Sequence, residues 1–382
     1  MSEVVTESVG ASDRKRSVLW SYAVFLTVIV PIALAVVFYR VDPFDPAELP
    51  LHELAQQDLV VPRVNDRLLH GSEFIGSGQM LGPEDIAFEP ESGVIYTGCA
   101  DGWVKRVKVN DSVSDSVVEN WVYTGGRPLG LVLGLNNEVI VADAFKGLLN
   151  LSRNGNMELL TDEVEGRKLK FADGVDVAKD GMIYFTEASY KYDLSGFIWD
   201  VFEGKPHGSL MSFDPTTRRT KVLVRNLYFP NGVQVSPDQK SVIFCETVMR
   251  RCKKYIREGE REGSVDMFVD NLVGVPDNIR YDGEEHYWIA FSTSVKPYWD
   301  IAFKYPLVRK ILAIVTRYIG RPQMEKNGGL LAIDMEGKPI AHYYDPKLSM
   351  ISGGNKIGRH LYIGFLHHPY IMRLNLDQHA AS

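Results

Sequence analysis

A short phrase occurs six times along the chain, and its spacing limits the possible folds more than any other feature. Each copy joins a turn to a hydrophobic strand, and a second strand rich in aromatic or β-branched residues soon follows. The copies begin, at spacings of 45, 44, 58, 46 and 76 residues, at Pro83, Pro128, Ala172, Pro230, Pro276 and Ser352. A unit repeated every ~40–50 residues is typical of a propeller blade, because one four-stranded sheet cannot bury its faces alone. The phrases predict an all-β, six-bladed β-propeller, with insertions at the two long spacings.

The second residue of each phrase indicates a site. In order around the ring these residues are Glu84, Leu129, Asp173, Asn231, Asp277 and Gly353, and Asn278 follows directly. Equivalent positions of innermost strands should face the channel at one depth, so three carboxylates and two amides are expected to converge. Without a cation these charges would repel one another, and a donor set made only of oxygens favours calcium over zinc. The alternative is that they are ordinary turn residues, since Asp-Gly and Asn-Gly are common where strands begin.

Composition excludes several classes of protein. The net charge is −7, and no basic cluster interleaved with aromatic residues is present, which argues against a nucleic-acid partner. The three cysteines, Cys99, Cys245 and Cys252, form no zinc-binding pattern. Cys245 and Cys252 flank a predicted turn and could pair in an oxidising compartment, or they could be two unpaired blade cysteines.

The N-terminal region contains a long uncharged segment. Residues 17–39 are 23 consecutive residues without a charge, and as a helix they would span about 35 Å, enough for a bilayer. Basic residues at 14–16 precede this segment and acidic residues follow it, which predicts a signal anchor with residues 1–16 in the cytoplasm. The alternative is a cleaved signal peptide with a processing site near Ala33-Leu34-Ala35.

This anchor sets the expected organisation of the rest of the chain. Residues 40–79 would form a stalk and a closing strand, and residues 80–376 the propeller, on the lumenal or extracellular side. The protein is then a single-pass type II membrane protein of the secretory pathway, in the endoplasmic reticulum, the vacuole or the plasma membrane. Two acceptor sequons, at Asn110 and Asn150, predict glycosylation in that compartment.

The two long spacings contain unusual segments. Residues 297–325, expected between blades five and six, carry apolar residues at helical spacing beside basic ones. This segment is either a helix packed on the propeller rim or a basic amphipathic lid that touches the membrane and covers the channel mouth. Residues 190–208, expected between blades three and four, are rich in aromatic side chains that could line a pocket or only pack on the rim.

Several segments together resemble the strictosidine synthase-like family, and especially its membrane-anchored branch, which includes adipocyte plasma membrane-associated protein. They are GRPLGL (126–131), FADGVDVAKDGMIYFTEAS (171–189), PNGVQVSPD (230–238), FCET (244–247) and GVPDNIRYDGEEHYWIA (274–290). The resemblance covers the chain from about residue 80 and implies a six-bladed propeller. The pattern is more distantly similar to calcium-dependent propeller lactonases such as paraoxonase and regucalcin. That similarity implies metal ligands at Glu84, Asn231, Asp277 and Asn278.

The chain departs from these families at two positions. Strictosidine synthase uses a last-blade glutamate as its acid/base, but residues 346–376 contain no Asp or Glu. Leu129 stands where a paraoxonase-like site would need a histidine. His367 and His368 follow the last-blade strand and could supply a base, although a His-His-Pro sequence at a strand end is more often an exposed turn.

The sequence supports three hypotheses of function. The first is a calcium-dependent ester or lactone hydrolase for a small-molecule substrate, in which the metal stabilises an oxyanion and Asp173 or Glu187 accepts a proton from water. The second is an amine–aldehyde condensing enzyme with a displaced acid such as Glu187. The third is a non-catalytic, membrane-anchored binding module in which the metal only rigidifies the ring. No G-x-S-x-G nucleophile motif is present.

Overall fold

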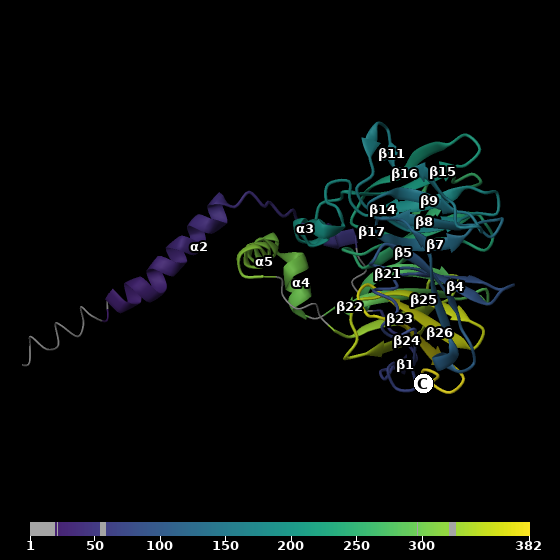
Figure 1. The fold of residues 1–382 in the computed structure, drawn as a ribbon. Coiled ribbons are helices and arrows are strands. Elements are labelled where there is room, and N and C mark those ends of the chain that lie inside the picture. The colour runs from purple at the N-terminus through teal and green to yellow at the C-terminus, as the bar shows by residue number, and fades with distance from the viewer. Residues whose placement is uncertain (1–19, 21, 54–58, 296, 321–325) are drawn as a thin grey trace, which may run out of the picture.

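The computed structural model describes residues 20, 22–53, 59–295, 297–320 and 326–382 of the 382-residue chain. Six sheets, antiparallel except for one added strand, stand around a central channel, as the sequence predicts (Figure 1). The innermost strands β3, β7, β13, β17, β21 and β25 each contact the next one, and β25 contacts β3. The ring is therefore closed, and the inner edge of each blade is short and lies protected in the channel.

The first three blades follow one another along the chain and run outward from the channel. Blade one contains β3 (Ile86–Glu89), β4 (Val94–Gly98), β5 (Trp103–Lys108) and β6 (Val117–Tyr123). Blade two contains β7 (Pro128–Leu133), β8 (Val139–Asp143), β9 (Gly147–Leu151) and β10 (Met157–Thr161). A separate hairpin follows, formed by β11 (Glu163–Val164) and β12 (Arg167–Lys168). Blade three contains β13 (Ala172–Val177), β14 (Ile183–Glu187), β15 (Gly208–Asp214) and β16 (Arg219–Leu227).

The last three blades complete the circle. Blade four contains β17 (Pro230–Val235), β18 (Ser241–Glu246), β19 (Arg251–Ile256) and β20 (Val265–Val269). Blade five contains β21 (Gly274–Tyr281), β22 (Tyr287–Ser294), β23 (Gly328–Ile333), β24 (Pro339–Asp345) and, parallel to β24, β1 (Val64–Asn65). Blade six contains β25 (Ile351–Ile357), β26 (His360–Phe365), β27 (Ile371–Asn375) and β2 (Glu73–Ile75).

The outer strand of the sixth blade comes from the other end of the propeller sequence. Strand β2 pairs antiparallel with β27, with Ile75 opposite Ile371 and Glu73 opposite Arg373. The Arg373 guanidinium also binds the Glu73 carboxylate at 2.8 Å. The first and last parts of the ring are thus joined by backbone hydrogen bonds and an ion pair.

The hydrophobic core is divided among the spaces between neighbouring blades. Phe185 and Met211 of blade three pack with Ile140 and Leu148 of blade two, and other residues fill the remaining gaps in the same way. Burial of each large apolar side chain contributes about 1.5–3 kcal/mol to stability, so the ring depends on contacts that no single blade makes alone. Between β18 and β19, Cys245 and Cys252 lie opposite each other and form a disulfide.

Both helical insertions emerge on the same face of the propeller, where second strands end and third strands begin. The helix α3 (Phe197–Glu203), preceded by the short 3-10 helix η4 (Leu194–Gly196), lies between β14 and β15. Helices α4 (Pro297–Lys304) and α5 (Pro306–Tyr318) lie between β22 and β23. The two insertions are therefore inside blades three and five, and their expected positions between blades were wrong. Phrase spacing locates only the innermost strands, so it cannot tell an insertion within a blade from one after it.

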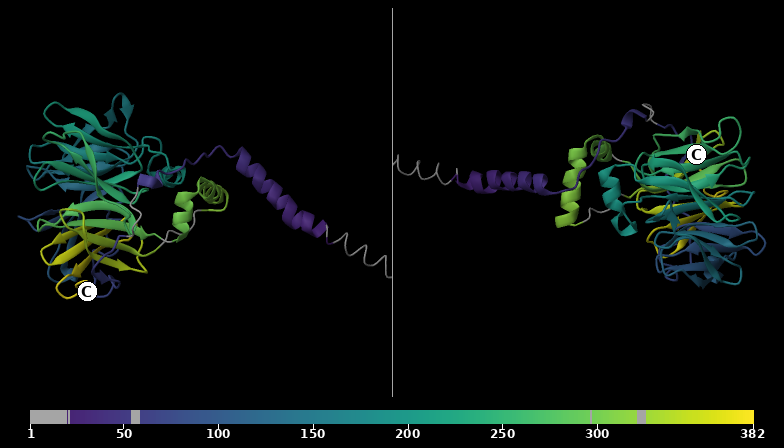
Figure 2. Two further views of the ribbon diagram at one scale, coloured as in Figure 1. Left: turned by 180° about the vertical axis from the view of Figure 1, so that it is seen from behind. Right: turned by 90° about the horizontal axis from the view of Figure 1, so that it is seen from above.

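The N-terminal segment lies apart from the propeller, on the side of the helical insertions (Figure 2). It contains the π-helical turn η1 (Phe25–Ile29) and α2 (Val30–Val41). Residues 17–19 and 21 of the expected anchor are outside the described residues. Within the described part of the chain, no helix has both the length and the apolar character needed to cross a bilayer. Two further 3-10 turns are η2 (Leu51–Glu53) and η3 (Val113–Asp115).

Candidate metal centre and pocket

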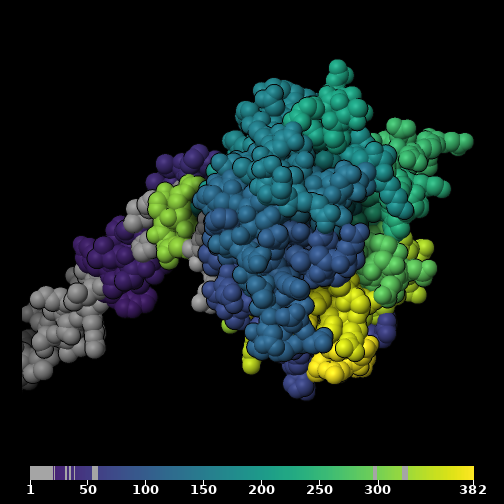
Figure 3. All heavy atoms as spheres, turned by 45° about the vertical axis from the view of Figure 1, so that its right-hand side comes forward, coloured from purple at the N-terminus to yellow at the C-terminus, as the bar shows by residue number. Residues whose placement is uncertain are grey.

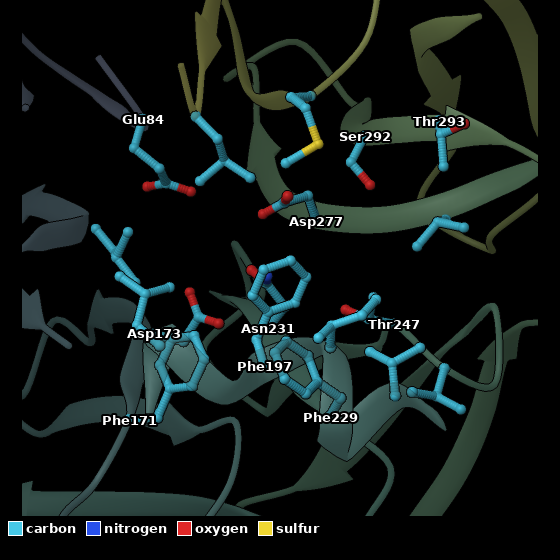
Figure 4. Close-up of a pocket in the computed structure, with 18 of the residues that line it drawn as sticks. Glu84, Phe171, Asp173, Phe197, Phe229, Asn231, Thr247, Asp277, Ser292 and Thr293 are labelled. Atoms are coloured by element: carbon cyan, nitrogen blue, oxygen red, sulfur yellow. The ribbon is translucent and has the colours of Figure 1, made fainter. Parts of the chain in front are cut away.

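A cavity of about 280 Å³ opens where the channel meets the face that carries the helical insertions. Its floor is polar and comes from the innermost strands, and Figure 4 shows Glu84, Asp173, Asn231 and Asp277 pointing toward one another there. Its walls are apolar. They come from α3 and its flanking turn, from α4, and from loops between strands, and include Phe171, Leu194, Phe197, Ile198, Val201, Phe229, Trp299, Phe303, Met350 and Leu366.

The floor residues converge because the blade phrases are in register around the ring. Asp173, Asn231 and Asp277 are on β13, β17 and β21, and Glu84 lies just before β3. Asn278, the next residue on β21, donates a hydrogen bond from Nδ2 to Glu84 Oε1 at 2.7 Å. The side chains that the sequence predicted to meet therefore come from four different blades and meet at one end of the channel.

Glycine follows the site residue in the phrases of blades three and four, and close packing requires it there. A Cβ on Gly174 would lie 2.5 Å from the Asn231 carbonyl oxygen, and one on Gly232 would lie 2.6 Å from the Asn278 Cα atom. Real Cβ atoms do not approach backbone so closely, so a larger residue would push neighbouring inner strands apart. The Gly in ADGVDV and PNGVQV thus brings the polar side chains of adjacent blades within reach of one another.

Four oxygen atoms of the floor are buried and have no hydrogen-bond partner: Glu84 Oε2, Asn231 Oδ1, Asp277 Oδ1 and Asn278 Oδ1. Burying such atoms unpaired costs about 1–3 kcal/mol each, and more for a charged group. A cluster of unpaired acceptors from neighbouring residues is unusual in a folded protein. A bound cation that takes oxygen ligands would be coordinated by these atoms and would satisfy all four.

Burial also disfavours the charged forms of the floor carboxylates. It raises the pKa of Glu84 well above its usual value, and the neighbouring charges of Asp277, Asp85 and Asp173 raise it further. Burial likewise raises the pKa of Asp277, with Asp173 adding to the effect and a hydrogen bond from Asn231 opposing it. The pKa of Asp173 rises to about 8, mainly through burial. These carboxyls therefore need either protons or a cation at neutral pH.

Arg127 is a pocket residue that the sequence reasoning missed. It is buried beside the floor and donates from Nη1 to the carbonyl oxygens of Gly98 and Pro128, at 3.3 and 3.4 Å, and from Nη2 to that of Leu366 at 3.5 Å. Its positive charge opposes the upward pKa shifts of Glu84, Asp173 and Asp277. The sequence did contain a signal for this position. Arg127 directly precedes Pro128, the first residue of the blade-two phrase, and the second residue of each phrase is expected to face the channel.

A second group of charged residues, here called the tie layer, surrounds the channel next to the floor and consists of Asp85, Asp176 and Arg280. Arg280 donates to Asp85 and, at 3.1 Å, to the Val233 carbonyl oxygen. Asp85 also accepts from the backbone nitrogen atoms of Ile86 and Leu131, at 2.8 and 3.1 Å. Asp176 accepts from the backbone nitrogen of Val235 at 2.6 Å. The tie layer is paired within the protein and joins several blades.

Glu187 does not belong to the pocket. Its two carboxylate oxygens bind Arg167 of the β11–β12 hairpin at 2.7 and 2.6 Å, and Oε1 also accepts from the Lys170 backbone nitrogen at 3.1 Å. The last residue of a second strand can face either side of its sheet, and here an arginine from outside the blade holds it. The structure thus brings Asp173 to the pocket floor and places Glu187 away from it.

His367 is exposed and His368 half-buried; their rings are stacked with centroids 4.5 Å apart, and neither lines the pocket. Burial lowers the pKa of both imidazoles.

The predicted glycosylation sites differ in exposure. Asn110 is exposed in the loop after β5, whereas Asn150 is within β9 and its Oδ1 atom is buried.

The donor set suits calcium better than a transition metal. Among the described residues, no three His, Cys, Asp or Glu side chains form a metal site by themselves. The candidate centre instead combines the carboxylates of Glu84 and Asp277 with the amide oxygens of Asn231 and Asn278, which are hard ligands. The residues fit a calcium ion by chemistry, because the unpaired oxygens are of the type that this cation binds.

A closed six-bladed propeller with an acidic pocket at one channel end defines the structural class, and comparison with known proteins gives the family. Residues 173–260 match the family model described as strictosidine synthase, and residues 63–107 match that described as strictosidine synthase-like, N-terminal. Protein STRICTOSIDINE SYNTHASE-LIKE 6 of Arabidopsis thaliana is 52% identical over 366 residues, which cover 95% of this chain and 98% of that protein. The chain belongs to the strictosidine synthase-like family.

A further relative and two solved structures are similar over most of the chain. Adipocyte plasma membrane-associated protein of Gallus gallus is 32% identical over 405 residues, covering 98% of this chain and 96% of that protein. A solved gluconolactonase from Xanthomonas campestris aligns with a TM-score of 0.57 at 16% identity, over 88% of this chain and 99% of that chain. A calcium-binding protein, regucalcin, from Agrobacterium tumefaciens aligns with a TM-score of 0.54 at 16% identity, over 83% of this chain and 95% of that chain. At these identities the solved structures show a shared fold.

Proposed function

We propose that this protein is a calcium-dependent hydrolase of ester or lactone bonds. The observation that carries the proposal is a set of four buried, unpartnered oxygens. Three are on Glu84, Asn231 and Asp277, which line the floor of an apolar pocket, and the fourth is on Asn278, which is bonded to Glu84. Calcium held by these residues would polarise the substrate carbonyl and stabilise the negative charge that develops on its oxygen. A gluconolactonase and a calcium-binding protein have the same fold, which supports this choice among the chemistries a propeller can host.

Asp173 is the pocket residue best placed to handle a proton. It lines the floor and, because its pKa is about 8, it can exchange a proton near neutral pH. A neighbouring cation would lower that pKa and leave the carboxylate ready to accept a proton from an attacking water molecule. The apolar walls exclude bulk water and so strengthen electrostatic interactions at the reacting carbonyl. Arg127, on the same floor, adds a fixed positive charge beside the developing oxyanion.

The test uses the full chain purified in detergent. Hydrolysis of phenyl acetate, p-nitrophenyl acetate and a γ-lactone is measured with calcium and with the chelator EGTA. We expect activity with calcium, its loss with EGTA, and its loss in Asp277→Asn, which removes one charged ligand while keeping the side-chain size. Glu119→Gln, which changes an exposed carboxylate on β6, is the matched control and should keep full activity.

Other outcomes would favour the competing functions. Activity that survives both EGTA and Asp277→Asn would contradict the proposal. Condensation of an amine with an aldehyde would instead use Asp173 as the acid, since its raised pKa keeps a proton available without metal. Calcium binding without turnover of any substrate would favour a binding module whose metal only rigidifies the ring.

We also propose that the chain is attached to a membrane of the secretory pathway with the propeller on the lumenal or extracellular side. The basic residues before position 17, the uncharged segment that follows and the Cys245–Cys252 disulfide support this placement. A tag at Met1 should stay with carbonate-washed membranes. Glycosidase treatment should shift the electrophoretic mobility of the parent chain, and it should not shift that of the Asn110→Gln variant if Asn110 is the one sequon used. Release of a shortened chain by carbonate would show that the segment is cleaved.

A further inference from the structure

Helix α5 is inverted relative to an ordinary surface helix. Its buried residues are Arg309, Ala313 and Thr316. Its outward residues include Leu307, Ile311 and Tyr318, which are 53%, 48% and 63% exposed. A helix packed on a water-soluble protein normally buries its apolar side and exposes its charged side. The outward side of α5 therefore lacks the polar character that contact with water favours.

The inverted orientation is fixed by specific bonds. Arg309 is 2% exposed. Its Nε atom donates to the Ala302 carbonyl oxygen of α4 at 3.0 Å, Nη1 donates to that of Phe202 in α3 at 3.2 Å, and Nη2 donates to that of Ala47. Rotating α5 to hide its apolar side would break all three bonds and leave a buried charge unsatisfied. The fold holds the apolar side outward.

Other apolar side chains continue this surface. Ile301 and Tyr305, in α4 and directly after it, are 50% and 49% exposed. Together with Leu307, Ile311 and Tyr318 they form what is here called the lid face. Helix α4 also places Trp299 and Phe303 in the pocket wall, so it separates the pocket from the lid face. In Figure 3 the light green atoms at the left belong to α4 and α5, and they project from the propeller beside the purple N-terminal segment.

The lid face is next to the end of α2. The Lys310 ammonium lies 4.5 Å from the centre of the Tyr39 ring, and Arg317 binds Asp42 at 2.5 Å. Tyr39 is the last residue of the uncharged segment 17–39. Lys304 and Lys310 border the lid face and provide positive charge that complements anionic lipid headgroups. The apolar surface, its basic border and its position beside an apolar segment all fit the same partner.

We infer that the lid face lies against the surface of a lipid bilayer, with Leu307, Ile311 and Tyr318 inserted at the headgroup–acyl boundary. The contact brings the pocket wall formed by α4 to the membrane surface, where ligands dissolved in the lipid can reach it. The inference does not rest on the proposed chemistry, because it concerns only where α5 lies.

The test labels the full chain in phosphatidylcholine–phosphatidylserine vesicles. Ile311→Cys carries an NBD fluorophore, and Cys99 is buried while Cys245 and Cys252 are bonded to each other, so the new thiol reacts selectively. We expect emission at shorter wavelength than in water, quenching by doxyl-labelled lipids and protection from aqueous iodide. Tyr318→Cys should behave in the same way and guards against a local disturbance by one substitution.

The control is Glu260→Cys, in the exposed turn between β19 and β20 at the opposite end of the propeller. Its label should emit as in water and be quenched by iodide only. If the labels at 311 and 318 match this control, the inference is wrong. The inference is also wrong if the two labels are protected from iodide but not quenched by doxyl lipids, and the two positions cross-link between chains. The lid face would then join two copies of the protein. Hydrolase activity enters neither readout, so failure of the proposed function leaves this test unaffected.

Discussion

Two groups of acidic side chains surround the channel, with Glu84 and Asp85 adjacent in sequence, and they differ in how their oxygens are satisfied. Asp85, in the tie layer, receives hydrogen bonds from Arg280 and from two backbone nitrogens. Glu84, on the pocket floor, has one oxygen bonded to Asn278 and one buried without a partner. Both carboxylates are almost fully buried. Acidic residues that the fold has paired are structural, whereas those left unpaired beside a cavity are available to a ligand.

The comparison therefore separates stability from binding. Changes in the tie layer should weaken the fold with or without calcium. Changes on the pocket floor should instead alter how stability responds to calcium and to pH.

The largest effect is expected for Arg280→Met. This change leaves Asp85 buried without its charged partner, and breaking a buried pair in this way costs about 3–5 kcal/mol. The loss in the free energy of unfolding, measured by urea denaturation, should be equal with calcium and with EGTA. A loss seen only with calcium would assign Arg280 to the metal centre and contradict the distinction between the two groups.

Calcium itself should have the next largest effect. At a concentration one hundred times the Kd, it should stabilise the native chain by about 2.7 kcal/mol. In Asp277→Asn this gain should nearly vanish, while the metal-free variant should be at least as stable as the parent, because a carboxyl whose pKa is raised by burial has been removed. Thermal melting with calcium and with EGTA measures both quantities. An unchanged calcium gain in the variant would exclude Asp277 as a ligand, and Glu119→Gln provides the matched comparison.

A pH dependence should appear in the metal-free protein. The pKa of Asp173 is about 8 in the folded chain, far above its ordinary value near 3.8, so the native state holds a proton that the unfolded state releases between these values. Stability should fall as pH rises through this window, by about 1.4 kcal/mol per pH unit for one proton. Asp173→Asn should reduce this slope in denaturation curves at pH 5, 6, 7 and 8 with EGTA. Equal slopes for the two proteins would show that Asp173 is already ionised.

The smallest effect is expected for Thr247→Val. Thr247 Oγ1 donates to the Pro276 carbonyl oxygen at 2.8 Å and joins blade four to the strand that carries Asp277. Loss of one neutral hydrogen bond at nearly constant volume costs about 1 kcal/mol. Urea denaturation should show this loss, and calorimetric titration should show little change in calcium affinity. A large fall in affinity would mean that this bond positions Asp277.

The sequence predicted most of the ring because each blade repeats the same local phrase. Glu84, Asp173, Asn231 and Asp277 could be placed together from their common position in that phrase, without knowledge of any long-range contact. Side chains outside the phrase could not be placed in this way. Arg127 reaches the floor from the residue before the phrase, and Glu187 turns away from it because Arg167, 20 residues earlier, holds it.

Helices α4 and α5 also show that side-chain positions set by long-range contacts cannot be predicted from local sequence. Helical spacing in residues 297–325 predicted a helix, and its basic and apolar residues suggested either rim packing or membrane contact. Which side faces outward depends on Arg309 meeting carbonyl groups from α3, α4 and the segment after α2. The contacts with Phe202 and Ala47 span 107 and 262 residues, and contacts at such separations leave no pattern in a local sequence window.

The pairing of β2 with β27 affects the order of events during synthesis. Glu73 and Arg373 are 300 residues apart, so β2 leaves the ribosome long before its partner strand exists. Glu84 follows β2 closely, and its contact with Asn278 spans 194 residues. Closing such long loops is slow and comes late in folding. A nascent chain that lacks its last blade therefore has an incomplete ring, and the calcium affinity proposed above would be acquired only when the finished polypeptide closes on itself.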